Sequence, residues 1–425
     1  MMQALLAPLR ELAELEEIQK EQKKEAGMLL LSNCSGSEKT HLMYGLSGEF
    51  RKKLIIRSSS EKAASTYEEY RFLSENVYLY PAKDLLFYHA DIKGKYLLQK
   101  RMEVIREILN APEDLTIITT MDAFLDGMPL LESFRKHTLE VESGQTLDLR
   151  AVEQYLAEAG YEREIQVDAP GQFAVRGGIL DIYPLTDEVP VRIELWGDEV
   201  DSIRTFDPDS QRSIENLERI TVYPAGDLET DGESPCSFLD YFDPEETLLF
   251  LDEPNRLAEA LEEVEQEVEK SREKREEQEM HLDQELKEMI PAKEIYRRIN
   301  QFYSVGFATL ENWCKEFRVR GIYPLDVRRV NPYNSSFETL TRDLKRLKRE
   351  KYRVVLLSGS RTRAKRLAED LRDYDLNSFF SEDMERTVNP GEILVAYGHV
   401  AEGYEYPMLK FMVIAESDIF GRKKK

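Results

Sequence analysis

A strand-to-helix turn near the N-terminus narrows the possible folds of this chain more than any other feature. Residues 28–31 predict a buried strand, and the apolar-periodic stretch after the turn predicts a helix. Between them, residues 33–40 read Asn-Cys-Ser-Gly-Ser-Glu-Lys-Thr and imitate the phosphate-loop motif G-x-x-x-x-G-K-[ST]. Short apolar runs at 53–57 and 115–119 alternate with helical segments such as 99–109, which is typical of βα repetition. We therefore predict an α/β unit with a parallel sheet.

The imitation of a phosphate loop fails at the two positions where glycine is required. Glycine lets the backbone curl and brings its N–H groups up to the anion, but these positions hold Asn33 and Glu38. The Glu38 carboxylate would repel a phosphate about 4 Å away by roughly 4 kcal/mol at an effective dielectric of 20. Gly36, Lys39 and Thr40 complete this degenerate loop, and the last two retain the types that hold phosphate and magnesium. We expect no ATP binding, with residual nucleotide binding as the alternative.

A possible second half of a nucleotide site follows the apolar strand predicted at 247–251. Asp252 and Glu253 have the form of a Walker-B pair, in which one carboxylate holds magnesium and the other orients water. Such a pair is common by chance, and beside a damaged loop we interpret it as a relic. We therefore predict no catalytic residue and no cofactor for this chain.

Charge and cysteine content exclude several classes of protein. The net charge of −24, from 82 acidic and 58 basic residues, disfavours intrinsic DNA binding. A predicted helix carries a basic cluster that we interpret as a solvated face, with nucleic-acid contact as the alternative; its members are Arg342, Lys345, Arg346, Lys348, Arg349 and Lys351. The three cysteines lack the spacing of a zinc site or a disulfide framework. Without a signal peptide or an apolar run of about 20 residues, a cytoplasmic protein is expected.

Changes in pattern divide the chain into four segments. A helix at 149–159 and strand-rich sequence with Gly-containing turns predict a small α/β domain, and a charged run at 256–289 without Gly or Pro predicts a long solvated helix. The last segment again alternates strands and helices. The predicted segments are 1–134, the first part of an α/β domain; 135–226, an inserted α/β domain; 227–335, the second part of the first domain; and 336–425, a C-terminal α/β domain with the start of a linker.

Three stretches of the inserted segment resemble a block shared by two DNA-repair families, UvrB and the bacterial transcription-repair coupling factor. They are Gln-Phe-Ala-Val-Arg-Gly-Gly-Ile-Leu-Asp-Ile-Tyr-Pro at 172–184, Pro-Val-Arg-Ile-Glu at 190–194 and Phe-Asp-Pro-Asp-Ser-Gln-Arg-Ser at 206–213. Supporting matches lie at 238–242, 252–254 and 416–421, so the resemblance extends over nearly the whole chain.

Three departures from UvrB favour the coupling-factor family. The phosphate loop is broken, and UvrB has Ser-His where this chain has Pro254-Asn255. UvrB also carries an aromatic DNA-clamping hairpin, for which the stretch from Tyr80 through Tyr88 and His89 to the helix at 99–109 leaves no room. The resemblance implies that 1–134 and 227–335 are the two parts of one degenerate RecA-like domain, split by the inserted domain.

The resemblance also implies a role in transcription-coupled nucleotide excision repair. In that family the chain continues into an RNA-polymerase-interacting domain and two ATP-driven, DNA-translocating motor domains, which hold ATP and Mg²⁺ and displace stalled polymerase. We therefore expect this chain to be the N-terminal part of such a protein, to recruit UvrA and not to be an enzyme itself. The alternatives are a divergent UvrB-like damage-verifying ATPase and an autoinhibitory module that contacts the motor domains.

The strand predicted at 191–196 carries the candidate partner-binding residues. Its residues alternate, so if the aliphatic ones face the core, Arg192 and Trp196 point outward. An exposed Trp beside Arg is typical of an interface hot spot, although a neighbouring helix could instead cover Trp196. The resemblance implies that the UvrA-binding positions are Arg176, Arg192 and Trp196, the last usually Phe in the family.

Overall fold

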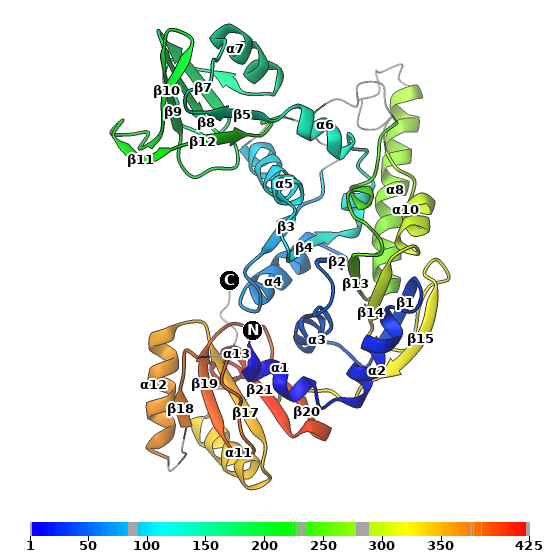
Figure 1. Cartoon of the computed structure of the whole chain (residues 1–425). Coiled ribbons are helices and arrows are strands. Elements are labelled where there is room, and N and C mark those ends of the chain that lie inside the picture. The colour runs from blue at the N-terminus through cyan, green and yellow to red at the C-terminus, as the bar shows by residue number, and fades with distance from the viewer. Residues whose placement is uncertain are drawn as a thin grey trace.

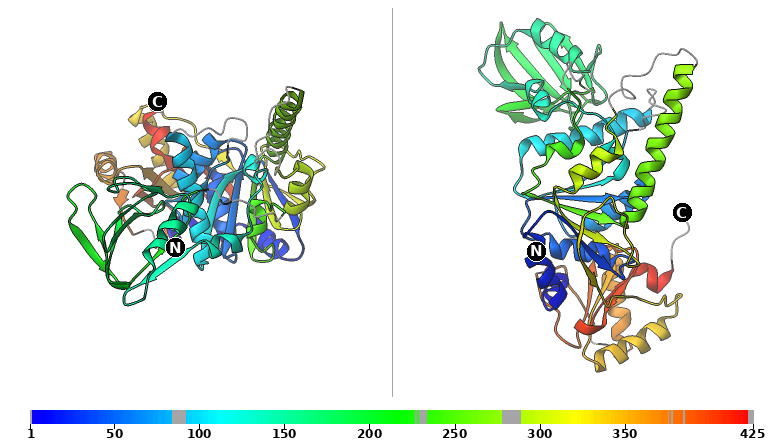
Figure 2. Two further views of the ribbon diagram at one scale, coloured as in Figure 1. Left: turned by 90° about the horizontal axis from the view of Figure 1, so that it is seen from above. Right: turned by 90° about the vertical axis from the view of Figure 1, so that its right-hand side faces the viewer.

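The computed structural model describes residues 2–83, 92–226, 228, 234–277, 289–374, 376, 378–383 and 385–421. It has an α/β fold, as predicted, with three large sheets arranged along the molecule (Figure 1). The inserted sheet lies at one end, the C-terminal sheet lies at the other, and the main sheet lies between them (Figure 2). None of the helices in this described part is long and apolar enough to span a membrane.

The main sheet has seven parallel strands in the order β15-β1-β14-β13-β2-β4-β3. Strands β1, β4 and β13 are buried along their whole length, which explains their apolar runs without alternation. Two separate parts of the chain supply the strands, which are β1 (Gly27–Ser32), β2 (Lys52–Arg57), β3 (Val77–Tyr80), β4 (Leu115–Thr120), β13 (Thr247–Asp252), β14 (Tyr303–Phe307) and β15 (Val319–Pro324).

The helices of this region are α2 (Ala13–Gln22), α3 (Glu38–Leu46), α4 (Ser60–Tyr70), α5 (Ile92–Asn110), α6 (Leu131–Lys136), α8 (Pro254–Glu277) and α10 (Ala292–Ile299), with short 3₁₀ turns at Met121–Phe124 and Phe238–Tyr241. The helix predicted at 99–109 is thus the last part of α5. The helix predicted at 256–289 was drawn too long at its end, because Met289 is not helical; residues 278–288 lie outside the described residues. The leucine and valine side chains of α8 pack on the core, whereas its charged face is solvated, as expected for such a charged run.

The inserted segment folds as a six-stranded sheet with α7 (Leu149–Glu158), which begins at the N-cap Asp148. The first and last strands of the segment, β5 (Leu139–Glu142) and β12 (Arg219–Val222), form a separate antiparallel pair that holds the two ends of the insertion together. The sheet order is β11-β10-β9-β8-β7-β6. Its strands are β6 (Glu162–Arg163), β7 (Gln172–Arg176), β8 (Ile179–Tyr183), β9 (Val191–Trp196), β10 (Glu199–Phe206) and β11 (Ser213–Leu217).

The C-terminal sheet has the order β16-β20-β21-β17-β19-β18 and begins before residue 336, at β16. Helices α11 and α12 pack on one of its faces, and α1 and α3 from the start of the chain pack on the other. The C-terminal unit therefore shares a core with the first segment. Its elements are β16 (Arg328–Arg329), α11 (Phe337–Arg349), β17 (Arg353–Ser358), α12 (Arg361–Arg372), β18 (Ser378–Phe380), β19 (Ile393–Tyr397), β20 (Tyr404–Tyr406), a 3₁₀ turn (Pro407–Leu409), β21 (Phe411–Ala415) and α13 (Glu416–Phe420), covered by α1 (Gln3–Leu9).

Candidate functional site

The degenerate phosphate loop connects β1 to α3 at the carboxyl ends of the main-sheet strands. Its first residue, Asn33, has the left-handed φ of 65° that the absent glycine would adopt, a conformation that asparagine tolerates better than most residues. Glu38, the first residue of α3, is buried and folds back over the loop. Its Oε1 accepts the N–H of Gly36 at 2.8 Å and also the N–H of Ser35. The carboxylate therefore lies where a phosphate loop holds its anion.

The lysine of the loop is paired inside the chain. Lys39 Nζ donates to Asp252 Oδ1 and to Glu253 Oε1, both at 2.8 Å, and its side chain is buried. Parallel strands bring these groups together, because β1 and β13 end at the same edge of the sheet. Although burial opposes ionisation, the charges of Arg57 and Lys39 hold the pKa of Asp252 below its ordinary value.

The threonine of the loop is also occupied. Thr40 Oγ1 and Ser37 Oγ each donate to the carboxylate of Glu69 on α4 at 2.8 Å. The same carboxylate accepts the N–H of Ala401, which belongs to the C-terminal unit, at 2.9 Å. The hydrogen-bonding groups of Ser37, Lys39 and Thr40 are thus occupied by carboxylates of this chain, so these residues do not fit a nucleotide phosphate.

The C-terminal unit covers this loop directly. Arg329 of β16 donates to the Ser35 carbonyl oxygen at 2.7 Å and to Ser35 Oγ at 3.1 Å. The N–H of Glu402 donates to Ser37 Oγ at 3.2 Å, and an added Cβ at Gly36 would lie 3.4 Å from Glu402 Oε2. The degenerate loop therefore forms part of the contact surface for the C-terminal sheet.

The second candidate site is one end of the inserted sheet. Two-residue turns join β7 to β8 and β9 to β10, and each contains a glycine of positive φ, Gly177 at 63° and Gly197 at 66°. Strands β7 and β9 run in the same direction on either side of β8, so their last residues, Arg176 and Trp196, lie at the same end of the sheet.

Cross-strand register places the candidate residues on one face. Asp181 of β8 lies opposite Arg192 of β9, and the alternation along β9 brings Trp196 to the same face as Arg192. Trp196 is 85% exposed, so none of the helices that the structure describes covers it. The Arg176 side chain is 44% exposed.

Arg192 does not point freely outward as the alternation suggested. Its side chain is only 14% exposed, and its Nε and Nη2 donate to Asp181 at 2.7 and 2.9 Å. Nη2 also donates to Gln211 at 2.7 Å, and the guanidinium lies 4.4 Å from the centroid of the Phe206 ring. The expectation was wrong because a side chain on the polar face of a sheet can still be enclosed by its neighbours across the strands.

Comparison with known proteins bears directly on this face. Residues 139–228 match the family model of the UvrB interaction domain. The inserted segment is therefore similar to this domain family. The chain is 28% identical to the transcription-repair-coupling factor of Bacillus subtilis over an alignment 462 residues long, which covers 93% of this chain and 38% of the relative. The Staphylococcus epidermidis and Staphylococcus aureus RF122 factors are 23% and 22% identical, with 82% and 83% of this chain covered and 34% of each relative.

The resemblance to transcription-repair coupling factors is therefore confirmed over most of the chain. The chain spans about a third of the length of these curated relatives, since the covered shares of the relatives are 34–38%. The described geometry leaves the partner roles of Arg176, Arg192 and Trp196 as predictions.

Three residues that matter in this geometry did not emerge from the sequence. Asp181 and Gln211 lie inside the segment that matches the family model, but in the sequence they stood out only as members of the shared block. Glu69 lies in α4, with no motif around it to attract attention. A buried carboxylate in an otherwise apolar strand, Ile-Leu-Asp-Ile-Tyr, was the one available signal for Asp181, because such a group requires a partner.

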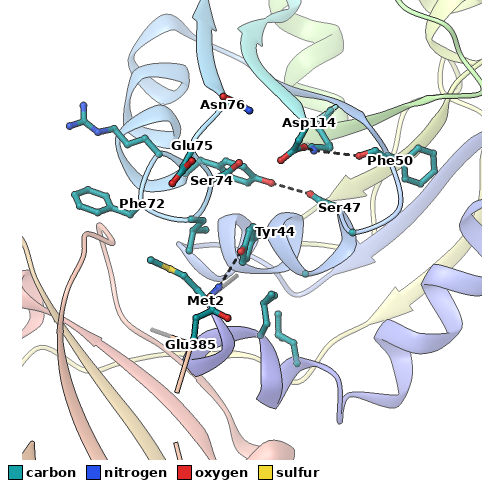
Figure 3. A pocket seen from close by; sticks show the side chains of 18 of the residues that line it. Met2, Tyr44, Ser47, Phe50, Phe72, Ser74, Glu75, Asn76, Asp114 and Glu385 are labelled. Atoms are coloured by element: carbon teal, nitrogen blue, oxygen red, sulfur yellow. Dashed lines mark hydrogen bonds and ion pairs between the residues drawn. The ribbon is translucent and has the colours of Figure 1, made fainter. Parts of the chain in front are cut away.

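Away from the inserted segment, a hollow of about 1360 Å³ opens between the first segment and the C-terminal unit (Figure 3). Its walls include leucines of α1, the Tyr70 and Ser47 hydroxyls at 3.0 Å from each other, and Tyr44, whose hydroxyl accepts the N–H of Met2 at 3.4 Å. The rim mixes both signs of charge. Among the described residues, no group of three or more His, Cys, Asp or Glu is placed to hold a metal ion.

Proposed function

We propose that this chain recruits the excision-repair protein UvrA in transcription-coupled nucleotide excision repair. The relatives that cover most of the chain are named transcription-repair-coupling factors, which supports the pathway. The single observation that carries the partner is the exposed end of the inserted sheet, where Trp196 is 85% exposed and the half-exposed Arg176 ends a strand at the same end. An exposed indole with a neighbouring guanidinium is the composition of a protein-binding hot spot.

The role of Arg192 within this proposal differs from that of Arg176. The Arg192 guanidinium already makes a bidentate contact with Asp181, so its fork is not available for a second bidentate contact with UvrA. Arg176 uses Nη2 for Asp181 and keeps nearly half of its side chain in solvent. We therefore propose that Arg176 and Trp196 contact the partner directly. Arg192 would instead support this face through its bonds to Asp181, with only a small part of its side chain exposed to the partner.

The longer protein would supply the remaining activities. By resemblance, RNA polymerase, DNA, ATP and Mg²⁺ would be bound by parts beyond this chain, which would displace stalled polymerase by translocation on DNA. This chain would not be an enzyme. Filling of the degenerate loop by Glu38 supports that proposal, because the carboxylate and the nucleotide phosphate would compete for the same N–H groups.

Calorimetric or interferometric titration of UvrA tests the proposed partner. We expect Trp196→Ala and Arg176→Ala each to weaken binding by about 2 kcal/mol, which is roughly 30-fold in Kd. Arg163→Ala is the matched control, since Arg163 lies on the edge strand β6 opposite Phe173, hence on the other face of the sheet from Arg176, and pairs with Glu153. Unchanged affinity in the Arg176→Ala/Trp196→Ala double variant would show that UvrA binds elsewhere.

The same titration with Mg-ATP in place of UvrA separates this proposal from a UvrB-like ATPase. We expect no heat of binding at micromolar nucleotide. Micromolar affinity would favour the alternative function, because a damage-verifying ATPase must hold nucleotide in this loop.

A further inference from the structure

A single buried carboxylate connects the two arginines of the partner-binding face. Asp181 on β8 is fully buried, and its Oδ2 accepts from Arg176 Nη2 at 2.6 Å and from Arg192 Nη2 at 2.9 Å. Its Oδ1 accepts from Arg192 Nε at 2.7 Å. We propose that Asp181 is a positioning residue that holds Arg176 and Arg192 in the arrangement that UvrA recognises, an inference that rests on the proposed function.

The cross-strand register shows why a carboxylate is needed at this point. Arg192 lies opposite Arg204 of β10, and like charges in directly opposed positions destabilise a sheet. Each guanidinium has its own carboxylate partner: Arg192 pairs with Asp181, and Arg204 pairs with Glu194. Without Asp181, the enclosed Arg192 would lose its hydrogen-bonded carboxylate while a second cation lies opposite it.

Asp181 also determines where the more exposed arginine can be. Arg176 ends β7 beside a glycine turn, and its side chain is 44% exposed, so little else among the described residues restrains it. Arginine loses rotamer freedom when a partner immobilises it, and that loss weakens binding. A guanidinium held in advance by Asp181 has already lost most of this freedom.

The network reaches further than the two arginines. Arg192 Nη2 also donates to Gln211, whose backbone has a left-handed φ of 58° and whose N–H donates to the Asp207 carbonyl oxygen at 2.8 Å. The three stretches 172–184, 190–194 and 206–213 therefore meet at Asp181, Arg192 and Gln211. Asp181 is the one anion among these three residues, so the arrangement depends on it.

Four proteins test the inference: the unchanged chain, Asp181→Asn, Arg192→Ala and the double variant, each titrated with UvrA. We expect Asp181→Asn to raise Kd about 10-fold, consistent with loss of charge-assisted bonds that hold both arginines. In the Arg192→Ala background the same change should add only about 3-fold, because the part of the loss that runs through Arg192 is already gone while Asp181 still holds Arg176. Glu153→Gln is the matched control, since it changes a carboxylate–arginine pair between α7 and β6, on the other face of the sheet from Arg176.

The outcomes separate the two proposals. If the unchanged chain fails to bind UvrA, the proposed function is wrong. If it binds and Asp181→Asn binds equally well, or if the losses in the double variant add fully, Asp181 does not act through the arginines and the inference is overturned. Should Asp181→Asn not fold, Gln211→Ala is the second test, because it removes the other acceptor of Arg192 at a half-buried position. We expect Kd to rise about 3-fold and this rise to disappear in the Arg192→Ala background. A rise that adds fully to the loss in Arg192→Ala refutes the network.

Discussion

Replacing Glu38 by alanine would show whether a carboxylate stands in for phosphate in the degenerate loop. Glu38 accepts two backbone N–H groups, and a hydrogen bond to a charged group stabilises by ~1.5–3 kcal/mol. Against this, Glu38 Oε2 is buried without a partner among the described residues, so its removal relieves part of the burial penalty. We expect a net local loss of about 2 kcal/mol, equivalent to a roughly 30-fold change in an opening equilibrium.

Amide hydrogen exchange measures this loss where it occurs, since opening of a local segment need not unfold a chain of several sheets. The amides of Ser35 and Gly36 should exchange about 30-fold faster in Glu38→Ala. Glu38→Gln, which keeps an acceptor oxygen, should have a smaller effect, and Glu61→Ala, at an exposed first-turn position of α4, should have none. An acceleration below about 3-fold in Glu38→Ala would refute the reasoning, because the N–H groups would then not depend on this carboxylate.

Two further predictions concern the same region. Lys39→Met should lower the free energy of unfolding by about 3 kcal/mol in urea titration, because it leaves the buried Asp252 and its neighbour Glu253 short of a cation; a loss below 1 kcal/mol would contradict the pairing. Burial lowers the pKa of His41 from 6.5 to about 4, so the unfolded chain binds the extra proton between these values and stability is lost as pH falls from about 6.5 towards 4. The fall in unfolding midpoint between pH 7 and pH 5 should be smaller in His41→Gln, and an equal fall would contradict this assignment.

Much of the fold could be read from local pattern. The buried strands predicted at 28–31, 53–57, 115–119 and 247–251 agree with β1, β2, β4 and β13 to within one residue at each end. Continuous apolar runs are legible because both faces of a parallel sheet are covered. Short strands such as β16, β18 and β20 were not predicted, since two or three residues carry no periodic signal.

The long-range contacts were beyond any local pattern. The start of the chain forms two separate helices, α1 and α2, and α1 covers the C-terminal sheet. His41 shows the same limit: it bridges the Leu5 carbonyl oxygen and the Tyr406 hydroxyl, residues from opposite ends of the chain. Which surfaces share a core depends on how the chain closes on itself, and hydrophobic periodicity contains no information about that.

By itself, the sequence determined the class of fold, the loss of both loop glycines and the alternation of apolar and polar residues along 191–196. Each of these depends on the properties of neighbouring residues. Only the tertiary structure decided what replaces the phosphate and what holds the arginines. Glu38 turns back onto its own loop, Glu69 joins that loop to the C-terminal unit, and Asp181 engages Arg192 across two strands. A buried charge must find its partner in space, and strand register and domain packing determine which partner is within reach.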